Sequence, residues 1–137
     1  MDYEHLIKQA FKARKAAYAP YSNFTVGAAL LAKDGQIFSG CNVESATFTP
    51  GTCAERTAIF TAVAHGVKDF EAIAVVGGKT GACDLNYCPP CGVCRQMLME
   101  FCIPKEFVII IAKSESEYII KTLEELLPMS FSPENLR

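Results

Sequence analysis

Two short segments constrain this chain most, because each places cysteine where a loop is predicted to enter a helix. The first reads Thr52-Cys53-Ala54-Glu55-Arg56, and the second reads Pro90-Cys91-Gly92-Val93-Cys94-Arg95-Gln96. Two sulfurs separated by two residues can converge on one ion at a first helical turn, and a neighbouring helix start can supply a third. Unpaired N–H groups and the positive end of the helix dipole favour the thiolate at such positions. The two helix starts are therefore predicted to be neighbours in the fold.

Cys53, Cys91 and Cys94 are the predicted metal ligands, and Glu55 lies two residues from the first of them. Three protein ligands leave tetrahedral zinc one vacant position, which distinguishes catalytic zinc sites from closed structural ones. A carboxylate beside that position can handle protons for a bound water. The alternatives are buried small hydrophobes or a redox pair for the cysteines, and a dipole-favoured acid for Glu55. These alternatives do not explain why three cysteines and an adjacent acid occur together, so the pattern favours a zinc-activated water.

Composition limits the class of protein. The chain has 137 residues, half of them apolar and a fifth charged, which indicates one globular domain with a sizeable core. Seven cysteines could suggest a disulfide framework, but the count is odd and no basic start followed by an apolar run is visible. Reduced or metal-bound cysteines in a cytoplasmic protein are therefore expected. A formal charge of −2 without charge blocks argues against nucleic acid, and the apolar runs are too short for a membrane.

Hydrophobic patterns predict alternating helices and strands. A helix is expected over Leu6–Ala17, and a hairpin turning at Asp34-Gly35 is expected to join Phe24–Leu31 to Gln36–Cys41. Further helices are expected over Cys53–Ala64 and from Cys91, with strands at Ala72–Val76, Phe107–Ala112 and Tyr118–Ile120. This order predicts a layered α/β domain with at least two parallel strands.

The two cysteine motifs resemble those of the zinc nucleoside and nucleobase deaminases. The likeness extends to the small homotetrameric cytidine deaminases through further segments in the same order: Tyr18–Ser22, Phe24–Ala29, Gly40–Glu44, Cys53–Ala58, Pro90–Gln96 and Glu125–Pro128. It implies one three-layer α-β-α domain over residues 1–137, with a mixed, mostly five-stranded sheet and helices on both faces. It also implies hydrolytic deamination of cytidine and 2′-deoxycytidine in pyrimidine salvage, one Zn²⁺ per subunit, and a homotetramer with shared active sites.

The resemblance also implies roles for residues around the metal. Glu55 would take a proton from the water, deliver it to ring N3 and later protonate the departing ammonia. Three thiolates leave a dication with net negative charge, and Arg56 would offset that excess by donating hydrogen bonds to the sulfurs.

Five residues are implied to bind the substrate. Asn42 and Glu44 would hold the ribose 3′-hydroxyl, and the Ala54 N–H would meet the pyrimidine O2. Phe24 would line one side of the base, and Phe131 would stack on the base in a neighbouring subunit's site. On spacing alone, Asn42 and Glu44 would be ordinary turn residues and Phe24 a core strand residue.

Three positions depart from the family pattern. Cys88 adds a thiol three residues before a proposed ligand, where it could compete for zinc or form a disulfide. The rigid Pro89-Pro90 pair between them argues against joint convergence, so Cys88 is left out of the ligand set. Phe48 stands where the family often has tyrosine, which removes a hydroxyl, and Ser45 stands where asparagine is common.

Three other functions compete with deamination of free nucleosides. A structural zinc module would need a fourth ligand, which only Cys88 could supply. A nucleic-acid deaminase should show a basic face or a stacking platform, and neither is visible. A deaminase of a cytosine-nucleoside antibiotic such as blasticidin S is the runner-up, and Asn42-Val43-Glu44 argues against it because this segment suits an ordinary ribose.

Overall fold

The computed structural model describes residues 2–137 and is built on a mixed five-stranded sheet with the order β2-β1-β3-β4-β5. Only β3 and β4 pair in parallel, with α3 between them in the chain, and the other described neighbours are antiparallel. The elements are α1 (Tyr3–Arg14), β1 (Phe24–Ala32), β2 (Ile37–Cys41), α2 (Ala54–Ala64), β3 (Phe70–Lys79), α3 (Gly92–Phe101), β4 (Val108–Ala112), β5 (Tyr118–Thr122), α4 (Leu123–Leu126) and the 3-10 helix η1 (Pro133–Leu136).

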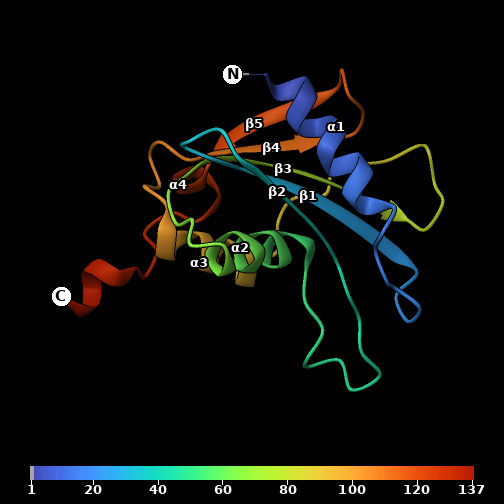
Figure 1. Ribbon diagram of the computed structural model, residues 1–137, viewed down its shortest axis with the longest axis horizontal. Helices are drawn as coiled ribbons and strands as arrows, with labels where there is room; N and C mark the ends of the chain where they lie inside the picture. The colour runs from blue at the N-terminus through green and yellow to red at the C-terminus, as the bar shows by residue number, and fades with distance from the viewer. Residues whose placement is uncertain (1) are drawn as a thin grey trace.

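Helices cover both faces of the sheet. Figure 1 shows α1 on one face and α2 and α3 on the other, with the strands between them. Each face has its own core: Leu6, Ile7 and Ala10 of α1 pack on one side, while Ile59 and Leu98 belong to the larger core on the other. The expected three-layer α-β-α architecture with a mixed five-stranded sheet is therefore confirmed.

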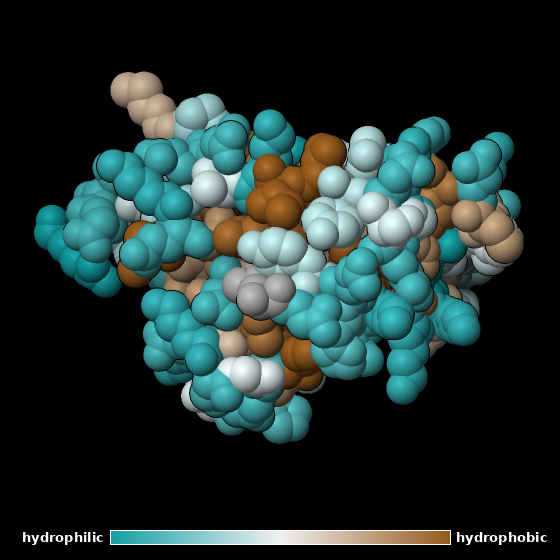
Figure 2. Space-filling model, turned by 90° about the horizontal axis from the view of Figure 1, so that it is seen from above, coloured by the Kyte–Doolittle hydropathy of each residue, from teal (hydrophilic) through white to brown (hydrophobic). Residues whose placement is uncertain are grey.

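The surface on the α1 side is mostly hydrophilic. Seen from above, hydrophobic residues reach the surface in patches near the middle of the view, and hydrophilic residues frame them (Figure 2).

None of the helices in the described part of the chain combines the length and apolar character needed to cross a bilayer.

Glycine allows both helical layers to approach the sheet closely. A Cβ added to Gly40 of β2 would lie 2.3 Å from the Ala54 carbonyl oxygen and 2.5 Å from the Ala58 nitrogen of α2. On the other face, a Cβ on Gly27 would lie 2.0 Å from the Ala10 oxygen of α1. The first turn of α2 therefore sits directly on the backbone of β2, and this contact sets the depth at which the Cys53 segment lies.

Two of the differences in element length from the sequence prediction concern α1 and β3. The helix α1 ends at Arg14 rather than Ala17, because Ala16 and Ala17 donate to carbonyls three residues back and tighten the last turn. The strand β3 continues beyond Val76, where the expected strand ends, to Lys79, so that Gly77 and Gly78 lie within the strand. A Cβ on Gly78 would lie 2.5 Å from Cδ2 of Leu85 in the following loop, which folds back on the strand, so the Leu85 side chain would have to shift.

Replacing Gly40 with alanine should destabilise the protein by about 1–3 kcal/mol, because backbone atoms of α2 must move to admit the methyl group. Urea unfolding followed by circular dichroism measures this loss. The control is Ser39→Ala on the same strand, since the Ser39 side chain is exposed. Equal stability of the two variants would show that α2 does not rest on Gly40.

Candidate active site

The helices α2 and α3 both begin with a predicted zinc ligand. Cys53 is the N-cap residue of α2, Cys91 is the N-cap residue of α3, and Cys94 lies in the first turn of α3. Neither capping cysteine accepts a hydrogen bond through its side chain from the free N–H groups of its helix. Free N–H groups of both first turns, and the positive ends of both dipoles, therefore favour negative charge on these sulfurs.

The three sulfurs form a compact cluster. The Sγ atoms of Cys53 and Cys91 are 3.6 Å apart, and all three sulfurs lie within 4.8 Å of one another. Zn–S bonds of about 2.3 Å in a tetrahedron place sulfurs about 3.8 Å apart, so this donor set fits zinc. Three thiolates fill three of the four positions, and this is the only such cluster of three or more potential ligands in residues 2–137.

Cys88 does not belong to the cluster. All seven cysteines are free, so Cys88 forms no disulfide, and burial raises the pKa of its thiol to about 11. Because its sulfur lies outside the group of three that approach within 4.8 Å of one another, Cys88 supplies no fourth ligand, which removes the basis of the structural zinc module.

The thiol pKa values of Cys53 and Cys94 are shifted in opposite directions. The pKa of Cys53 is lowered to about 5, mainly by a hydrogen bond from the Cys94 thiol and also by Arg56, whose Nη2 donates to Cys53 Sγ over 3.4 Å. The pKa of Cys94 is raised, because it donates that hydrogen bond to Cys53 and is buried. Of these two cysteines, Cys53 is therefore favoured as the thiolate, and Cys94 must release its proton when an ion binds.

Glu55 is a buried acid beside these sulfurs. Its side chain is 3% exposed, and burial raises its pKa to about 7, with the negative charge of Cys53 adding to the effect. A carboxyl group that titrates near neutrality can both accept and donate a proton at physiological pH. This is the behaviour predicted for Glu55 from the motif.

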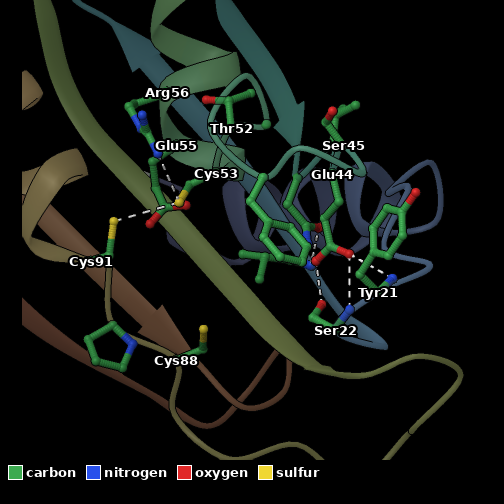
Figure 3. A pocket seen from close by; sticks show the side chains of 16 residues that line it. Tyr21, Ser22, Glu44, Ser45, Thr52, Cys53, Glu55, Arg56, Cys88 and Cys91 are labelled. Carbon is green, nitrogen blue, oxygen red and sulfur yellow. Dashed lines mark hydrogen bonds between the residues drawn. The ribbon is translucent and has the colours of Figure 1, made fainter.

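A cavity of about 530 Å³ opens in front of the cluster, within the usual range for small-molecule sites. Cys53, Glu55 and Cys91 lie at one end and Ser22 and Glu44 lie at the other (Figure 3). The remaining lining residues are Tyr21, Val26, Asn42, Val43, Ser45, Phe48, Gly51, Thr52, Arg56, Cys88 and Pro89.

Two predicted substrate residues, Asn42 and Glu44, are held by the chain at this second end. Glu44 accepts hydrogen bonds from the N–H groups of Tyr21 and Ser22 at 3.0 and 3.1 Å, and from the Ser22 hydroxyl. These bonds, with the Ser22 hydroxyl first, lower the pKa of Glu44 and keep it ionised. The Asn42 amide accepts from the Val26 N–H and donates to the Phe24 carbonyl, both at 2.8 Å.

The other three predicted substrate residues do not line the cavity of this single chain. Phe24 begins β1 and is 40% exposed, Ala54 is fully buried in the first turn of α2, and Phe131 is 58% exposed beyond α4. The cavity wall contains Val26 and Phe48 instead. Phe48 has a positive φ of 65° and packs edge-on against Tyr21 with ring centroids 5.9 Å apart.

Sequence reasoning gave Val26, Tyr21 and Ser22 no role of their own. Their only signal was membership of the segments that resemble the family pattern. Val26 reads as a core strand residue, and the Ser22 hydroxyl becomes informative only when Glu44 is seen to accept from it.

The fold and the three-sulfur cluster define a class of zinc-dependent hydrolases in which cysteine sulfurs hold the metal. The model of the cytidine and deoxycytidylate deaminase zinc-binding region matches residues 1–110, and the chain belongs to that family. Family membership and the three-sulfur cluster together assign one zinc ion per subunit to this site.

Similar proteins cover nearly the whole chain. A cytidine deaminase from Sporosarcina psychrophila is 46% identical over 136 residues, covering 99% of this chain and 96% of the relative. The crystal structure of cytidine deaminase from Burkholderia pseudomallei has a TM-score of 0.85 and 44% identity, covering 96% of this chain and 100% of that one. A blasticidin-S deaminase from Bacillus cereus is 34% identical, over 78% of this chain and 76% of its own length.

Zinc content should depend on Cys91 and not on Cys88. Cys91→Ala removes one of three sulfurs, so purified protein should lose most of its metal, whereas Cys88→Ser should retain about one zinc per subunit. Inductively coupled plasma mass spectrometry on protein purified with a reductant measures the ratio. Metal loss in Cys88→Ser together with retention in Cys91→Ala would reverse the ligand assignment.

Glu55→Gln should stabilise the zinc-free protein more as the pH rises. The folded pKa of about 7 lies above the ordinary value of 4.5, so burial of Glu55 costs stability progressively between these two pH values. The full difference corresponds to about 3 kcal/mol, and it should be reached above pH 7.

Urea unfolding of both proteins with chelator and reductant, at pH 4.5, 6.0 and 7.5, measures this gap. The Cys53 thiolate is common to both proteins, so the widening of the gap reports mainly on Glu55. A gap that does not change with pH would contradict the raised pKa.

Proposed function

We propose that this protein hydrolyses cytidine and 2′-deoxycytidine to uridine and 2′-deoxyuridine with release of ammonia, as a step of pyrimidine salvage. The observation that carries the proposal is the buried Glu55, with a pKa near neutrality, beside three sulfurs that fit zinc at the end of a cavity of nucleoside scale. The relatives named cytidine deaminase support the same reaction.

Glu55 performs the proton transfers. Cys53, Cys91 and Cys94 would hold a zinc ion, which would supply a water molecule that the metal makes more acidic. Glu55 accepts a proton from that water and donates one to ring N3, which makes C4 electrophilic. The water oxygen then adds to C4, and Glu55 takes the second proton from the C4 hydroxyl that results. As the C4–N bond breaks, Glu55 delivers that proton to the departing amine, so that a C4 carbonyl forms and ammonia leaves.

Arg56 offsets the negative charge of the three sulfurs. Three thiolates exceed the charge of a dication by one, and such an excess makes the water less acidic. The hydrogen bond from Arg56 to Cys53 draws electron density from one sulfur and offsets that excess.

Glu44 and Asn42 bind one hydroxyl of the sugar. A carboxylate has about four acceptor sites, and Tyr21 and Ser22 occupy three of those on Glu44, which leaves one for a ligand hydroxyl. The Asn42 amide has one N–H beyond that given to Phe24, which can donate to the same hydroxyl oxygen. The 3′-hydroxyl, which ribose and deoxyribose share, suits this pair.

The cavity favours nucleosides over nucleotides. Its wall contains the carboxylates of Glu44 and Glu55, and Arg56, already bonded to Cys53, is the only cation among the lining residues. A 5′-phosphate would bring about two negative charges into this cavity without a free cation to pair with. Of the two substrates that the family name covers, we therefore infer the free nucleoside.

We further propose a homotetramer in which Phe131 completes a neighbouring subunit's site by stacking on the base, with Phe24 and the Ala54 N–H as the remaining base contacts. The exposed position of Phe131, outside its own cavity, supports this arrangement. A zinc site made of thiolates requires reduced cysteines, which supports a reducing compartment such as the cytoplasm.

An absorbance assay with cytidine, deoxycytidine, cytidine 5′-monophosphate and blasticidin S tests the proposal. Both nucleosides should be deaminated, with kcat/KM at least 100-fold above the values for the monophosphate and the antibiotic. Glu55→Gln should retain zinc and lose at least 1000-fold in kcat, because the proton carrier is gone. Preferential turnover of the monophosphate or the antibiotic would refute the proposed substrate, and full activity of Glu55→Gln would refute the mechanism.

A further inference from the structure

The C-terminal segment, residues 128–137, is attached to the rest of the chain by a single hydrogen bond. Gln96 of α3 donates from Nε2 to the Phe131 carbonyl oxygen over 2.8 Å, and the segment's other hydrogen bonds are internal to it. None of its residues is buried. In Figure 1 the segment extends away from the sheet, beyond α3 and α4. Its placement therefore depends on Gln96 far more than on packing.

Arg95, the residue before Gln96, binds the backbone just before this segment. Arg95 donates from Nη1 to the Leu126 carbonyl oxygen and from Nε to the Pro90 carbonyl oxygen, both at 2.7 Å. Pro90 directly precedes the zinc ligand Cys91. Arg95 forms no ion pair within residues 2–137, so its role is to tie these two backbone carbonyls together.

We infer that Gln96 is a positioning residue that presents Phe131 to the neighbouring subunit's substrate, while Arg95 fixes the start of the same segment on α3. This inference rests on the proposed function, because it uses Phe131 as the stacking residue. The first turns of α3 thus serve two sites: Cys91 and Cys94 bind zinc in one, and Gln96 places a ring in the next.

The expected effect is on substrate binding and not on chemistry. Gln96 is exposed and its side chain contacts a backbone carbonyl, so removing the donor leaves no buried group unpaired. A neutral hydrogen bond contributes modestly, and its loss should raise KM roughly three- to ten-fold. The kcat value, the zinc content and the subunit count should stay at native values, because Cys91, Cys94 and Glu55 are untouched.

A double-mutant cycle tests the link between the two residues. Gln96→Met and Phe131→Ala should each raise the KM for cytidine, and the double variant should match Phe131→Ala alone. Glu100→Gln, also exposed on α3 and one turn further on, is the control and should keep the native KM. Multiplicative effects of the two substitutions, or zinc loss in Gln96→Met, would overturn the inference.

Limited proteolysis gives a readout that does not depend on activity. Chymotrypsin cleavage after Phe131, followed by mass spectrometry, should be faster in Gln96→Met than in the native protein or in Glu100→Gln. An unchanged cleavage rate would show that Gln96 does not hold the segment.

Failure of the proposed function looks different from failure of this inference. If the native protein does not deaminate cytidine, the proposed function fails, whatever the proteolysis shows. If it does so and Phe131→Ala keeps the native KM, only the role of Phe131, and with it the positioning role of Gln96, is lost.

Discussion

The convergence of two helix N-termini on one point is the constraint on which the rest of this structure depends. The sulfurs of Cys53, Cys91 and Cys94 can approach within 4.8 Å of one another only because α2 and α3 start side by side beneath the sheet. The absence of a side chain at Gly40 lets α2 rest on β2, which sets the depth of Cys53 and Glu55. Helix dipoles and free first-turn N–H groups then favour the anionic sulfurs that a dication requires.

The charged groups at this point have specific partners, with the exception of Glu55. Arg56 supports the Cys53 thiolate, the Cys94 thiol shares its proton with Cys53, and Glu55 is left buried without a cation of its own. The cost of burying Glu55 is what raises its pKa toward neutrality. Local stability is thus lost at the residue that we propose transfers protons, a pattern common at functional sites.

The far end of the cavity is organised by neutral backbone donors and carbonyls. Glu44 is oriented by Ser22 and Tyr21, and Asn42 is oriented by the backbone of β1, before any ligand enters. Such preorganisation lowers the entropy lost on binding. The Glu44 end of the cavity is therefore held by several hydrogen bonds, whereas the C-terminal segment that carries Phe131 is attached by one.

The sequence alone determined the features that depend on short spacing. Cys91 and Cys94 share one helical turn, Glu55 lies beside Cys53, and the hydrophobic runs define the strands, so the α/β class, the family and the zinc ligand cluster could all be predicted. Spacing could not reveal that Gly78 lies inside β3, or that Val26 and Phe48 line the cavity wall while Phe24 lies outside it. The substrate roles of individual residues remain predictions. The exclusion of Cys88 from the ligand set was predicted from Pro89-Pro90, and the cluster agrees with it. Tertiary structure alone decided the close approach of the three sulfurs and the raised pKa of Glu55, because close approach and burial arise only when distant segments pack together.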